Sequence, residues 1–257
     1  MIVPGVAALG MTASEASGAA PPRLLDAGEA ALVVEFGDAV DPAVHDRVLA
    51  LDAALLADPP PGLRESVPTY RSLMIHYDPL SLGREALAER VRRLADRPAA
   101  ARGPRARWTL PCCYDPALGE DLAAAAELLG LAPEQVAALH AAAEYRVYMY
   151  GFAPGFAYLG GLPGALAVRR RATPRPPHPA NAVMIGGGLA AVASLPMPTG
   201  WYVLGRTPER LYAPDRATPF LVQAGDLLRF EAVDAAAFAD LERRAAAGEV
   251  VARREPA

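Results

Sequence analysis

The segment of residues 144–208 holds so many turn-forming residues that no long helix can cross it. The run Tyr-Met-Tyr-Gly-Phe-Ala-Pro-Gly-Phe-Ala-Tyr-Leu-Gly-Gly-Leu-Pro fills residues 148–163, and three consecutive glycines follow at residues 186–188. Glycine adopts backbone conformations that a side chain forbids, whereas proline fixes the backbone path and lacks an N–H donor. Short strands between turns are therefore expected, a pattern that predicts a β-barrel or sandwich. These strands are expected near residues 146–150, 182–185, 201–205 and 227–233.

The first hundred residues show a different pattern, in which strands alternate with amphipathic helices. A helix is expected from Pro42 to about Ala57, because Val44, Val48, Leu51 and Leu55 recur at helical spacing on one face. A second helix is expected over residues 84–95, and strands are expected within residues 23–37, 63–67 and 72–77. The order β-β-α-β-β-α predicts a small α+β sandwich with its helices on one face of a sheet.

The fold class expected for the whole chain is α+β, with the sandwich followed by the barrel. We expect a disordered tail at residues 1–22, an N-terminal α+β domain at 23–97, a linker at 98–107, a barrel domain at 108–248 and a tail at 249–257. The linker is rich in proline, alanine and arginine, as segments between domains often are. Within the second domain, a strand is expected at 108–114 and helices at 121–130, 133–143 and 234–248.

Composition excludes several classes of function. The net charge of −4 argues against a nucleic-acid or anionic-membrane surface. No apolar run reaches the roughly 18 residues that a membrane helix needs. Cys112 and Cys113 are adjacent and are the only cysteines, so neither a disulfide framework nor a cysteine-based metal site is expected. These features predict a cytoplasmic protein that binds no metal.

The chain has no lysine, so a Walker A lysine, a lysine Schiff base and a lysine general base are all excluded. Phosphate or carboxylate would have to be held by arginine or by backbone N–H groups. Candidates lie within or just after the glycine-rich segment, with Arg175, Arg206 and Arg171 preferred over Arg169 and Arg170. The alternative is a solvated basic strand edge that prevents sheet pairing.

Other candidates are a histidine and a set of aromatic residues. His140 is the best candidate for a general base, although a histidine at a helix end is equally explained by the helix dipole. His178 is expected in a surface loop, and His45 and His76 are expected to be structural. One wall of a hydrophobic cleft is expected from Phe156, Tyr158 and Trp201 together with Phe152, with core packing as the alternative.

Several stretches together resemble one family of proteins. The stretches are Gly28-Glu-Ala-Ala-Leu-Val-Val-Glu-Phe36, Val67-Pro-Thr-Tyr-Arg-Ser-Leu73, Leu110-Pro-Cys-Cys-Tyr-Asp115, Gly119-Glu-Asp-Leu122, Gly151-Phe-Ala-Pro-Gly-Phe-Ala-Tyr-Leu159, Arg171-Ala-Thr-Pro-Arg175, Gly205-Arg-Thr-Pro208 and Ala224-Gly-Asp226. From about residue 23 to residue 233, the chain resembles the allophanate-hydrolase-subunit-1-like family, with carboxyltransferase subdomains C and D. The family includes the B subunit of 5-oxoprolinase and the sporulation-kinase inhibitor KipI.

The resemblance implies a small N-terminal α+β domain and a cyclophilin-like C-terminal barrel. It also implies a B subunit that works with an A subunit and a C subunit in an ATP-dependent 5-oxoprolinase, which opens the lactam of 5-oxoproline to glutamate. Two alternatives remain: a histidine-kinase inhibitor of the KipI type, and a diverged amide-hydrolase paralogue. The last is motivated by a departure, because Leu189-Ala190 stands where the family usually has Gln-Thr.

Overall fold

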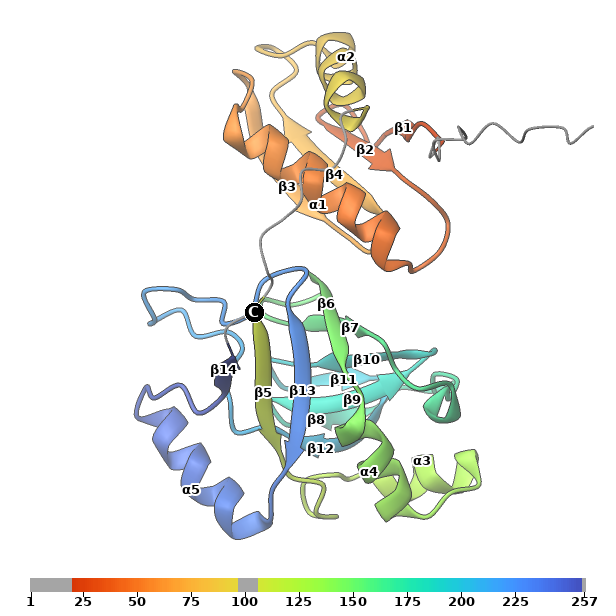
Figure 1. The fold of residues 1–257 in the computed structure, drawn as a ribbon, viewed down its shortest axis with the longest axis vertical. Coiled ribbons are helices and arrows are strands. Elements are labelled where there is room, and N and C mark those ends of the chain that lie inside the picture. The colour runs from red at the N-terminus through yellow and green to blue at the C-terminus, as the bar shows by residue number, and fades with distance from the viewer. Residues whose placement is uncertain (1–19, 97–105, 256–257) are drawn as a thin grey trace, which may run out of the picture.

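The computed structural model describes residues 20–96 and 106–255, which form a four-stranded and an eight-stranded sheet with separate hydrophobic cores, and a small two-stranded sheet (Figure 1). We call residues 20–96 the N-terminal part and residues 106–255 the C-terminal part. Most of the expected tail at 1–22 and of the expected linker at 98–107 lies outside the described residues. The domain boundaries therefore stay a prediction. The mixed α+β class is confirmed by the elements of both parts.

The N-terminal part is a four-stranded antiparallel sheet with two helices. Its strands are β1 (Arg23–Asp26), β2 (Ala31–Glu35), β3 (Leu63–Pro68) and β4 (Ser72–Tyr77), in the order β1-β2-β4-β3. The helices are α1 (Pro42–Ala57) and α2 (Arg84–Ala95), which agree with the expected ranges. Asp41 starts α1, because its side chain accepts hydrogen bonds from the N–H groups of Ala43 and Val44. The apolar faces of α1 and α2 cover the sheet.

The C-terminal part is built on an eight-stranded mixed sheet in the order β12-β9-β10-β7-β6-β13-β5-β14. Its strands are β5 (Arg107–Cys112), β6 (Tyr145–Tyr150), β7 (Ala157–Gly160), β9 (Ala182–Gly186), β10 (Leu189–Val192), β12 (Tyr202–Arg206), β13 (Leu227–Ala232) and β14 (Arg253–Glu255). Strands β5 and β13 pair in parallel, whereas the other neighbours are antiparallel. A separate two-stranded sheet joins β8 (Arg175–His178) to β11 (Met197–Thr199).

The part of the large sheet formed by β9, β10 and β12 is buried on both of its faces. Val183 and Ile185 of β9 enter the main core, while Met184 of the same strand enters a second, smaller cluster that contains Phe156 and Trp201. Successive side chains of a strand point to opposite faces, so burial on both faces produces a continuous apolar run. This explains why the sequence in these strands does not alternate between polar and apolar residues.

A closed cyclophilin-like barrel is not confirmed. In the described part of the chain, no ladder joins the two edge strands β12 and β14. The end of β5 instead meets β12 at one isolated bridge, in which the N–H groups of Cys113 and Arg206 each donate to the other's carbonyl at 2.9 and 3.0 Å. Gly205 allows this approach, because a Cβ there would lie 2.4 Å from the carbonyl oxygen of Cys113.

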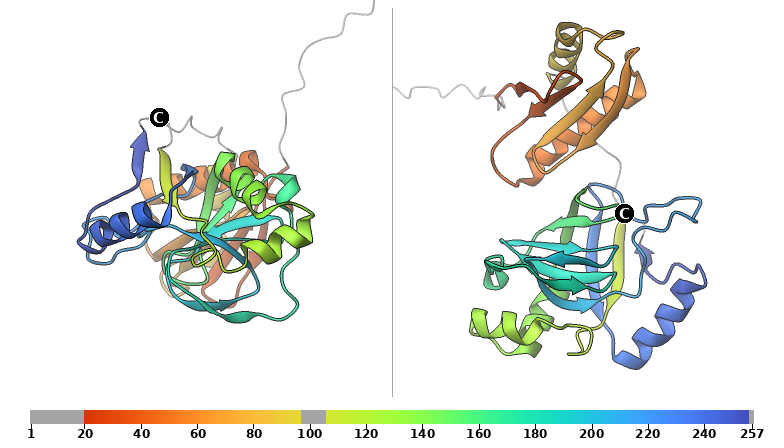
Figure 2. Two further views of the ribbon diagram at one scale, coloured as in Figure 1. Left: turned by 90° about the horizontal axis from the view of Figure 1, so that it is seen from below. Right: turned by 180° about the vertical axis from the view of Figure 1, so that it is seen from behind.

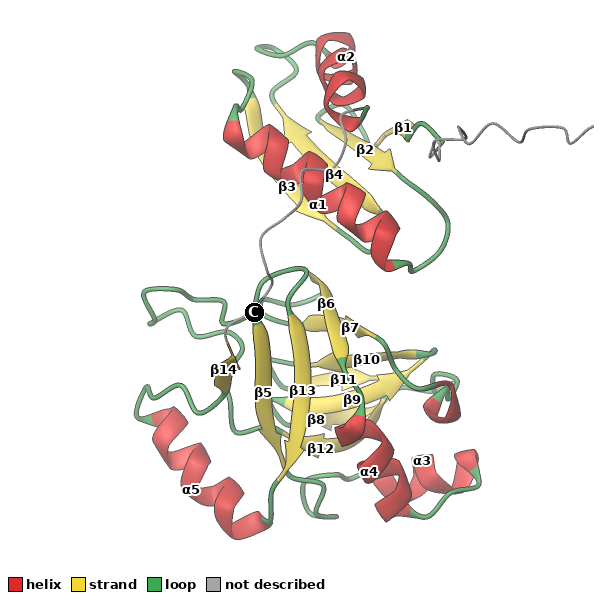
Figure 3. Ribbon diagram, in the orientation of Figure 1, coloured by secondary structure: helices red, strands yellow, loops and turns green. Residues whose placement is uncertain are grey.

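Three α-helices and one 3₁₀ turn surround the large sheet (Figures 2 and 3). Helices α3 (Leu122–Leu129) and α4 (Pro133–Ala142) pack against each other, and α5 (Ala235–Ala246) lies apart from them. The 3₁₀ turn η1 spans Gly164–Leu166. Gly130 ends α3 in the left-handed conformation at φ 67°, as expected of a glycine at this position.

Two sequence expectations need correction here. The expected tail at 249–257 contributes β14, which pairs with β5 through residues 253–255. Strands β7, β8, β10 and β11 were not expected, because they are short and rich in alanine, glycine or proline. Among the described residues, no single helix is long and apolar enough to cross a membrane; the bent pair α3–α4 meets that criterion only when the two helices are counted together.

Candidate functional site

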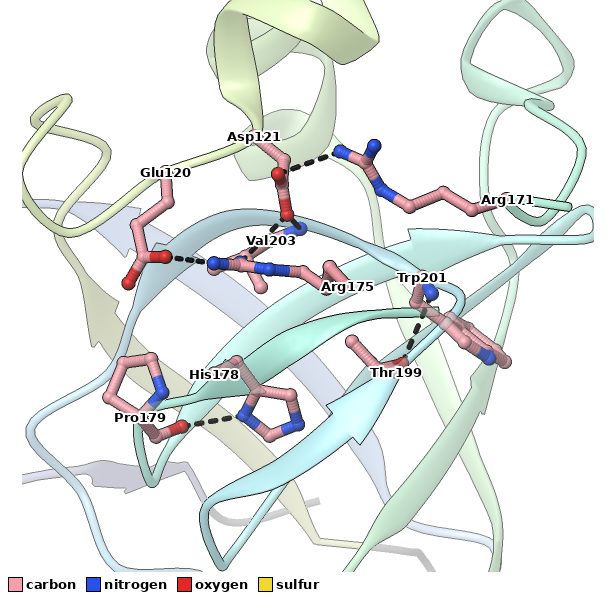
Figure 4. Close-up of polar contacts among 9 residues, drawn as sticks. All are labelled: Glu120, Asp121, Arg171, Arg175, His178, Pro179, Thr199, Trp201 and Val203. Carbon is pink, nitrogen blue, oxygen red and sulfur yellow. Dashed lines mark hydrogen bonds and ion pairs between the residues drawn. The ribbon is translucent and has the colours of Figure 1, made fainter. Parts of the chain in front are cut away.

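Two of the arginines expected to bind an anion are already bound to carboxylates within the chain. The buried Asp121 accepts hydrogen bonds from Arg171 at 2.7 Å, from Arg175 at 2.9 Å and from the N–H of Val203 at 3.0 Å (Figure 4). Glu120 forms a second ion pair with Arg175. Burial opposes the charge of Arg175, but Glu120 and Asp121 outweigh it and raise the pKa of the guanidinium. These arginines hold β8 and its preceding loop against the start of α3.

Arg206, at the end of β12, is similarly engaged, but by a different carboxylate. Its guanidinium contacts the Glu242 carboxylate at 3.1 Å and donates to the carbonyl of Ala180 at 3.2 Å. It also lies over the Phe238 ring, 5.4 Å from the ring centre. Arg206 therefore shares no partner with Arg171 and Arg175.

The predicted aromatic residues do come together, and a tyrosine from the N-terminal part joins them. The Tyr158 ring is centred 4.8 Å from Phe156, 6.2 Å from Trp201 and 6.0 Å from Tyr70, which lies in the turn between β3 and β4. Arg170 lies over the Trp201 ring at 5.0 Å. We call Tyr70, Tyr158, Trp201 and Arg170 the ring surface. Such contacts between rings and between guanidinium and ring are favourable.

Glycines give the ring surface its shape. A Cβ on Gly186 would lie 3.2 Å from the Trp201 ring, and one on Gly187 would lie 3.4 Å from Nε of Arg170. Gly187 also has a φ of 63°, which disfavours any other residue. The glycine run at 186–188 thus places the arginine and the tryptophan against each other. This contact gives a physical reason for the glycine density seen in the sequence.

Arg170, like the adjacent Arg169, has no carboxylate partner among the described residues, but of the two only Arg170 lies over an aromatic ring. Among the described residues, its guanidinium makes no ion pair and no side-chain hydrogen bond. It is exposed and lies close to two phenols: burial raises the pKa of Tyr70 and of Tyr158, and the positive charge of Arg170 partly offsets this rise. The sequence ranked this residue below Arg175 and Arg206, because pairing with carboxylates cannot be read from the chain.

Tyr70 was missed by the sequence analysis, although it lies in one of the stretches that carry the resemblance. Its Oη atom is shielded from solvent and has no hydrogen-bond partner in the described structure. Burial raises the pKa of Tyr70, so the phenol stays protonated and able to donate a hydrogen bond. A buried hydroxyl without a partner is unfavourable and therefore marks a position where a ligand atom can be accepted.

Phe152 lies at the margin of the ring surface. Its side chain is 78% exposed, and its backbone has a φ of 67°, which is rare for any residue but glycine. Its ring contacts Phe156 edge-on at 5.8 Å. Phe156 and Trp201 are themselves largely buried in one cluster. Of the residues expected to line a cleft, Phe156 and Trp201 therefore lie in the core, and Phe152 lies on the surface.

His140 lies apart from the ring surface, inside the main core. It is fully buried, its Nδ1 atom is 2.7 Å from Oη of Tyr114, and its ring packs on Phe230 at 4.7 Å. Burial lowers its pKa to about 3. The imidazole is thus neutral and out of contact with solvent at neutral pH. We therefore do not assign it proton transfer, and its position fits the structural alternative.

The burial of His140 predicts an acid-sensitive stability. The unfolded chain takes up a proton near pH 6.5 that the folded chain accepts only near pH 3, so each pH unit lost between these values removes up to about 1.4 kcal/mol from the free energy of unfolding. His140→Gln should be less stable than the parent at pH 7. The difference in free energy of unfolding between the parent and His140→Gln, measured by urea unfolding, should shrink by about 2–3 kcal/mol by pH 4.5.

The control for this prediction is Val136→Ala, which removes apolar volume from the same helix without removing an ionisable group. It should lower the free energy of unfolding by a constant amount between pH 4.5 and pH 7. A gap between His140→Gln and the parent that stays constant with pH would contradict the assignment of a buried neutral imidazole.

The remaining candidates have structural surroundings. His178, expected in a surface loop, is buried, and its Nδ1 lies 2.7 Å from the carbonyl of Pro179 (Figure 4). Burial lowers its pKa. Cys112 and Cys113 are buried, and burial raises the pKa of both thiols. Within residues 20–96 and 106–255, no group of histidine, cysteine and carboxylate side chains is arranged to hold a metal ion.

A cavity of about 560 Å³ lies between the two parts of the chain, and no residue of the ring surface lines it. Its lining combines apolar side chains with two carboxylates, and comprises Leu49, Asp52, Glu65, Ser66, Val67, Pro68, Met149, Tyr150, Phe220, Gln223 and Ala224. Predicted site residues are absent from this lining. The negative charge of Asp52 and Glu65 makes the cavity unfavourable for an anion.

The departure at Leu189-Ala190 also has a clear location. Leu189 packs on the cluster that contains Phe156 and Trp201, whereas Ala190 points into the main core on the other face of β10. Only the first of these two positions therefore adjoins the ring surface. An aliphatic side chain at position 189 makes this side of the ring surface more apolar than an amide side chain would.

The chain matches the family described as carboxyltransferase domain, subdomain C and D, over residues 22–222. It is 36% identical over 214 residues to the 5-oxoprolinase B subunit of Bacillus subtilis, covering 79% of this chain and 89% of that protein. It is 40% identical over 205 residues to the 5-oxoprolinase B subunit of Escherichia coli O157:H7, covering 79% and 92% respectively. Both relatives are thus matched over most of their length.

Solved structures agree with this result. TTHA0988 is 41% identical with a TM-score of 0.71, and the match covers 79% of this chain but only 40% of the length of TTHA0988. The conserved uncharacterized protein PH0987 from Pyrococcus horikoshii is 34% identical over 84% of this chain and all of its own, with a TM-score of 0.50. The urea carboxylase of Kluyveromyces lactis shares the fold at a TM-score of 0.75 and 15% identity, over 93% of this chain and 24% of its own. By sequence and by fold, this chain therefore belongs to the carboxyltransferase-domain family of subdomains C and D, the family of the 5-oxoprolinase B subunits.

Proposed function

We propose that this protein is the B subunit of an ATP-dependent 5-oxoprolinase, which converts 5-oxo-L-proline, ATP and water to L-glutamate, ADP and phosphate. The observation that carries the proposal is the match to 5-oxoprolinase B subunits over 89% and 92% of their length. In this proposal the chain forms a hetero-oligomer with a protein like the C subunit and with an A subunit, and it is inactive alone. We also propose a cytoplasmic location, which two free buried cysteines fit.

The described residues of this chain do not fit a triphosphate. The chain has no lysine, and Arg171, Arg175 and Arg206 are neutralised by Asp121, Glu120 and Glu242. Arg169 and Arg170 have no carboxylate partner among the described residues, and only Arg170 is held in place by a ring, which suits one carboxylate rather than several phosphate groups. We therefore place ATP binding elsewhere in the assembled complex. This chain would contribute binding and orientation of the substrate, or of the partner's active-site segment.

The proposal is tested by expressing this chain together with its A-type and C-type partners and measuring glutamate release. Turnover should require all three polypeptides and ATP, and each one alone should be inactive. Omission of this chain is the matched control. Full activity without this chain, or no glutamate from the complete set, would contradict the proposed role.

A diverged amide or lactam substrate is the second candidate, and one observation favours it. Leu189 packs on the Phe156 and Trp201 cluster at a position where the family usually has glutamine. An apolar wall favours a substrate with more apolar surface than 5-oxoproline. ATP-dependent turnover of alkylated lactams above that of 5-oxoproline would support this candidate.

We also propose that the C-terminal part has a cyclophilin-like fold.

A further inference from the structure

We propose that Arg170 and Tyr70 form a composite binding site for a small carboxylate whose flat body lies against Tyr158, while the buried Trp201 ring holds Arg170 in place. The site is shared by the two parts of the chain, since Tyr70 comes from the turn between β3 and β4 and the other three residues come from the C-terminal part. This inference deepens the proposed function and rests on it for the choice of probe. It assigns recognition to residues other than the arginines that the sequence favoured.

The first step concerns charge. Asp121, Glu120 and Glu242 neutralise Arg171, Arg175 and Arg206, which leaves Arg169 and Arg170 without a carboxylate among the described residues, and of these two only Arg170 is held against a ring. Its guanidinium is exposed and lies over the Trp201 ring. Gly187 leaves room for it, because a Cβ at that position would lie 3.4 Å from its Nε atom. A guanidinium fixed by a ring offers two parallel N–H donors with little loss of freedom on binding. That geometry matches the two oxygens of a carboxylate.

The second step concerns the phenol. Oη of Tyr70 has no partner in the described structure, while its ring is held by Tyr148 at 5.2 Å and by Tyr158 at 6.0 Å. Arg170 is near enough for its charge to act on the phenols of Tyr70 and Tyr158. A ligand oxygen that reaches between Arg170 and Tyr70 would satisfy a donor that is otherwise buried at a cost.

The third step concerns the body of the ligand. The half-buried Tyr158 ring favours a flat or compact ligand and gives little selectivity by itself, whereas the buried Trp201 ring is covered by Arg170. Arg170 and Tyr70 would therefore fix the orientation, and Tyr158 would supply contact area. A cyclic amide that bears one carboxylate meets both requirements. An uncharged carboxamide of the same shape meets only the second.

The experiment is a titration of the full-length chain with 5-oxo-L-proline, followed by calorimetry and by tryptophan fluorescence. Both tryptophans are buried, but Trp201 contacts Arg170 and should respond to the ligand, whereas Trp108 lies in the main core. Saturable binding in the low millimolar range or tighter is expected, with the carboxamide analogue on the order of tenfold weaker. Arg170→Gln should weaken binding at least about tenfold, and Tyr70→Phe about threefold to tenfold. Arg170→Lys should recover only part of the affinity, because lysine lacks the paired donors.

The matched control is Arg169→Gln, which removes the adjacent exposed arginine that has no ring contact, and its affinity should stay within about twofold of the parent. Equal binding by the parent and Arg170→Gln, equal affinity for acid and carboxamide, or no saturable binding would overturn the composite site. Because these measurements need no partner, a complete complex that turns over without such binding removes the site but keeps the proposed function. Binding with the expected variant pattern in a chain that supports no turnover keeps the site and removes that function.

Discussion

Glu209→Gln is expected to lower the free energy of unfolding by about 3–5 kcal/mol. The Glu209 carboxylate is fully buried and accepts four hydrogen bonds, two to each oxygen. Oε1 accepts from Arg216 and from the N–H of Arg210, both at 2.9 Å, and Oε2 accepts from the N–H groups of Val251 and Ala252 at 2.7 and 2.8 Å. Glutamine would leave the partly buried Arg216 without a counter-charge and would turn a donor toward donors. Urea unfolding at pH 7 measures the loss.

The control for Glu209 is Glu231→Gln, because Glu231 also holds the C-terminal strand through an ion pair, with Arg253 at 2.6 Å. Both of these side chains are about half exposed, and such a pair contributes roughly 0–1 kcal/mol. Amide hydrogen exchange in β14 adds a second readout, since Glu209→Gln should release residues 253–255 before the rest of the sheet unfolds. Similar losses for the two variants would show that burial of Glu209 does not matter.

Asp121→Asn is expected to lower the free energy of unfolding by about 2–4 kcal/mol. One carboxylate here binds Arg171, Arg175 and the N–H of Val203, and thereby holds the loop before β8, the start of α3 and β12 together. An amide can accept at one oxygen only, so at least one guanidinium loses its counter-charge. The same variant should weaken the composite site, because Arg171 is the neighbour of Arg170. Urea unfolding and the 5-oxoproline titration measure the two effects.

Glu120→Gln is the matched control for Asp121. It removes the other carboxylate on Arg175, but Glu120 is 37% exposed whereas Asp121 is 11% exposed at the side chain. Solvent compensates most of the loss at an exposed site, so a change of less than about 1 kcal/mol is expected. If Glu120→Gln were as destabilising as Asp121→Asn, the acidic pair would act as one unit, and the special role of Asp121 would be refuted.

The arginines show why recognition cannot be ranked from the chain alone. Arg175 and Arg206 stand in motifs that match the family, and both are engaged by carboxylates distant in the sequence, at Asp121 and Glu242. Arg170 lacks such a partner, and its guanidinium lies over the ring of Trp201 instead. Ion pairs between residues 36 or more positions apart depend on the packing of whole elements. Sequence spacing carries little information about them.

His140 shows that the burial of a side chain is equally hard to predict from the sequence. A histidine at the end of an amphipathic helix is compatible with a surface dipole interaction, with catalysis and with a core position. The structure selects the core, because Tyr114, Tyr145 and Phe230 close around its ring. None of these aromatic residues lies on the same helix. Tyr70 was missed for the related reason that its contacts with Tyr148 and Tyr158 cross between the two parts of the chain.

The sequence by itself determined the local elements of this protein. Helix α1 follows from the helical spacing of its apolar residues between a capping aspartate and a proline turn, and both α1 and α2 were predicted at their observed bounds. The family could also be predicted, because several motifs occur in one order. Tertiary structure alone decided that the large sheet stays open, that β14 completes it, and that Arg170 is an unpaired cation among the described residues. Local preferences act over a few residues, whereas burial and counter-charges are set by segments that only folding brings into contact.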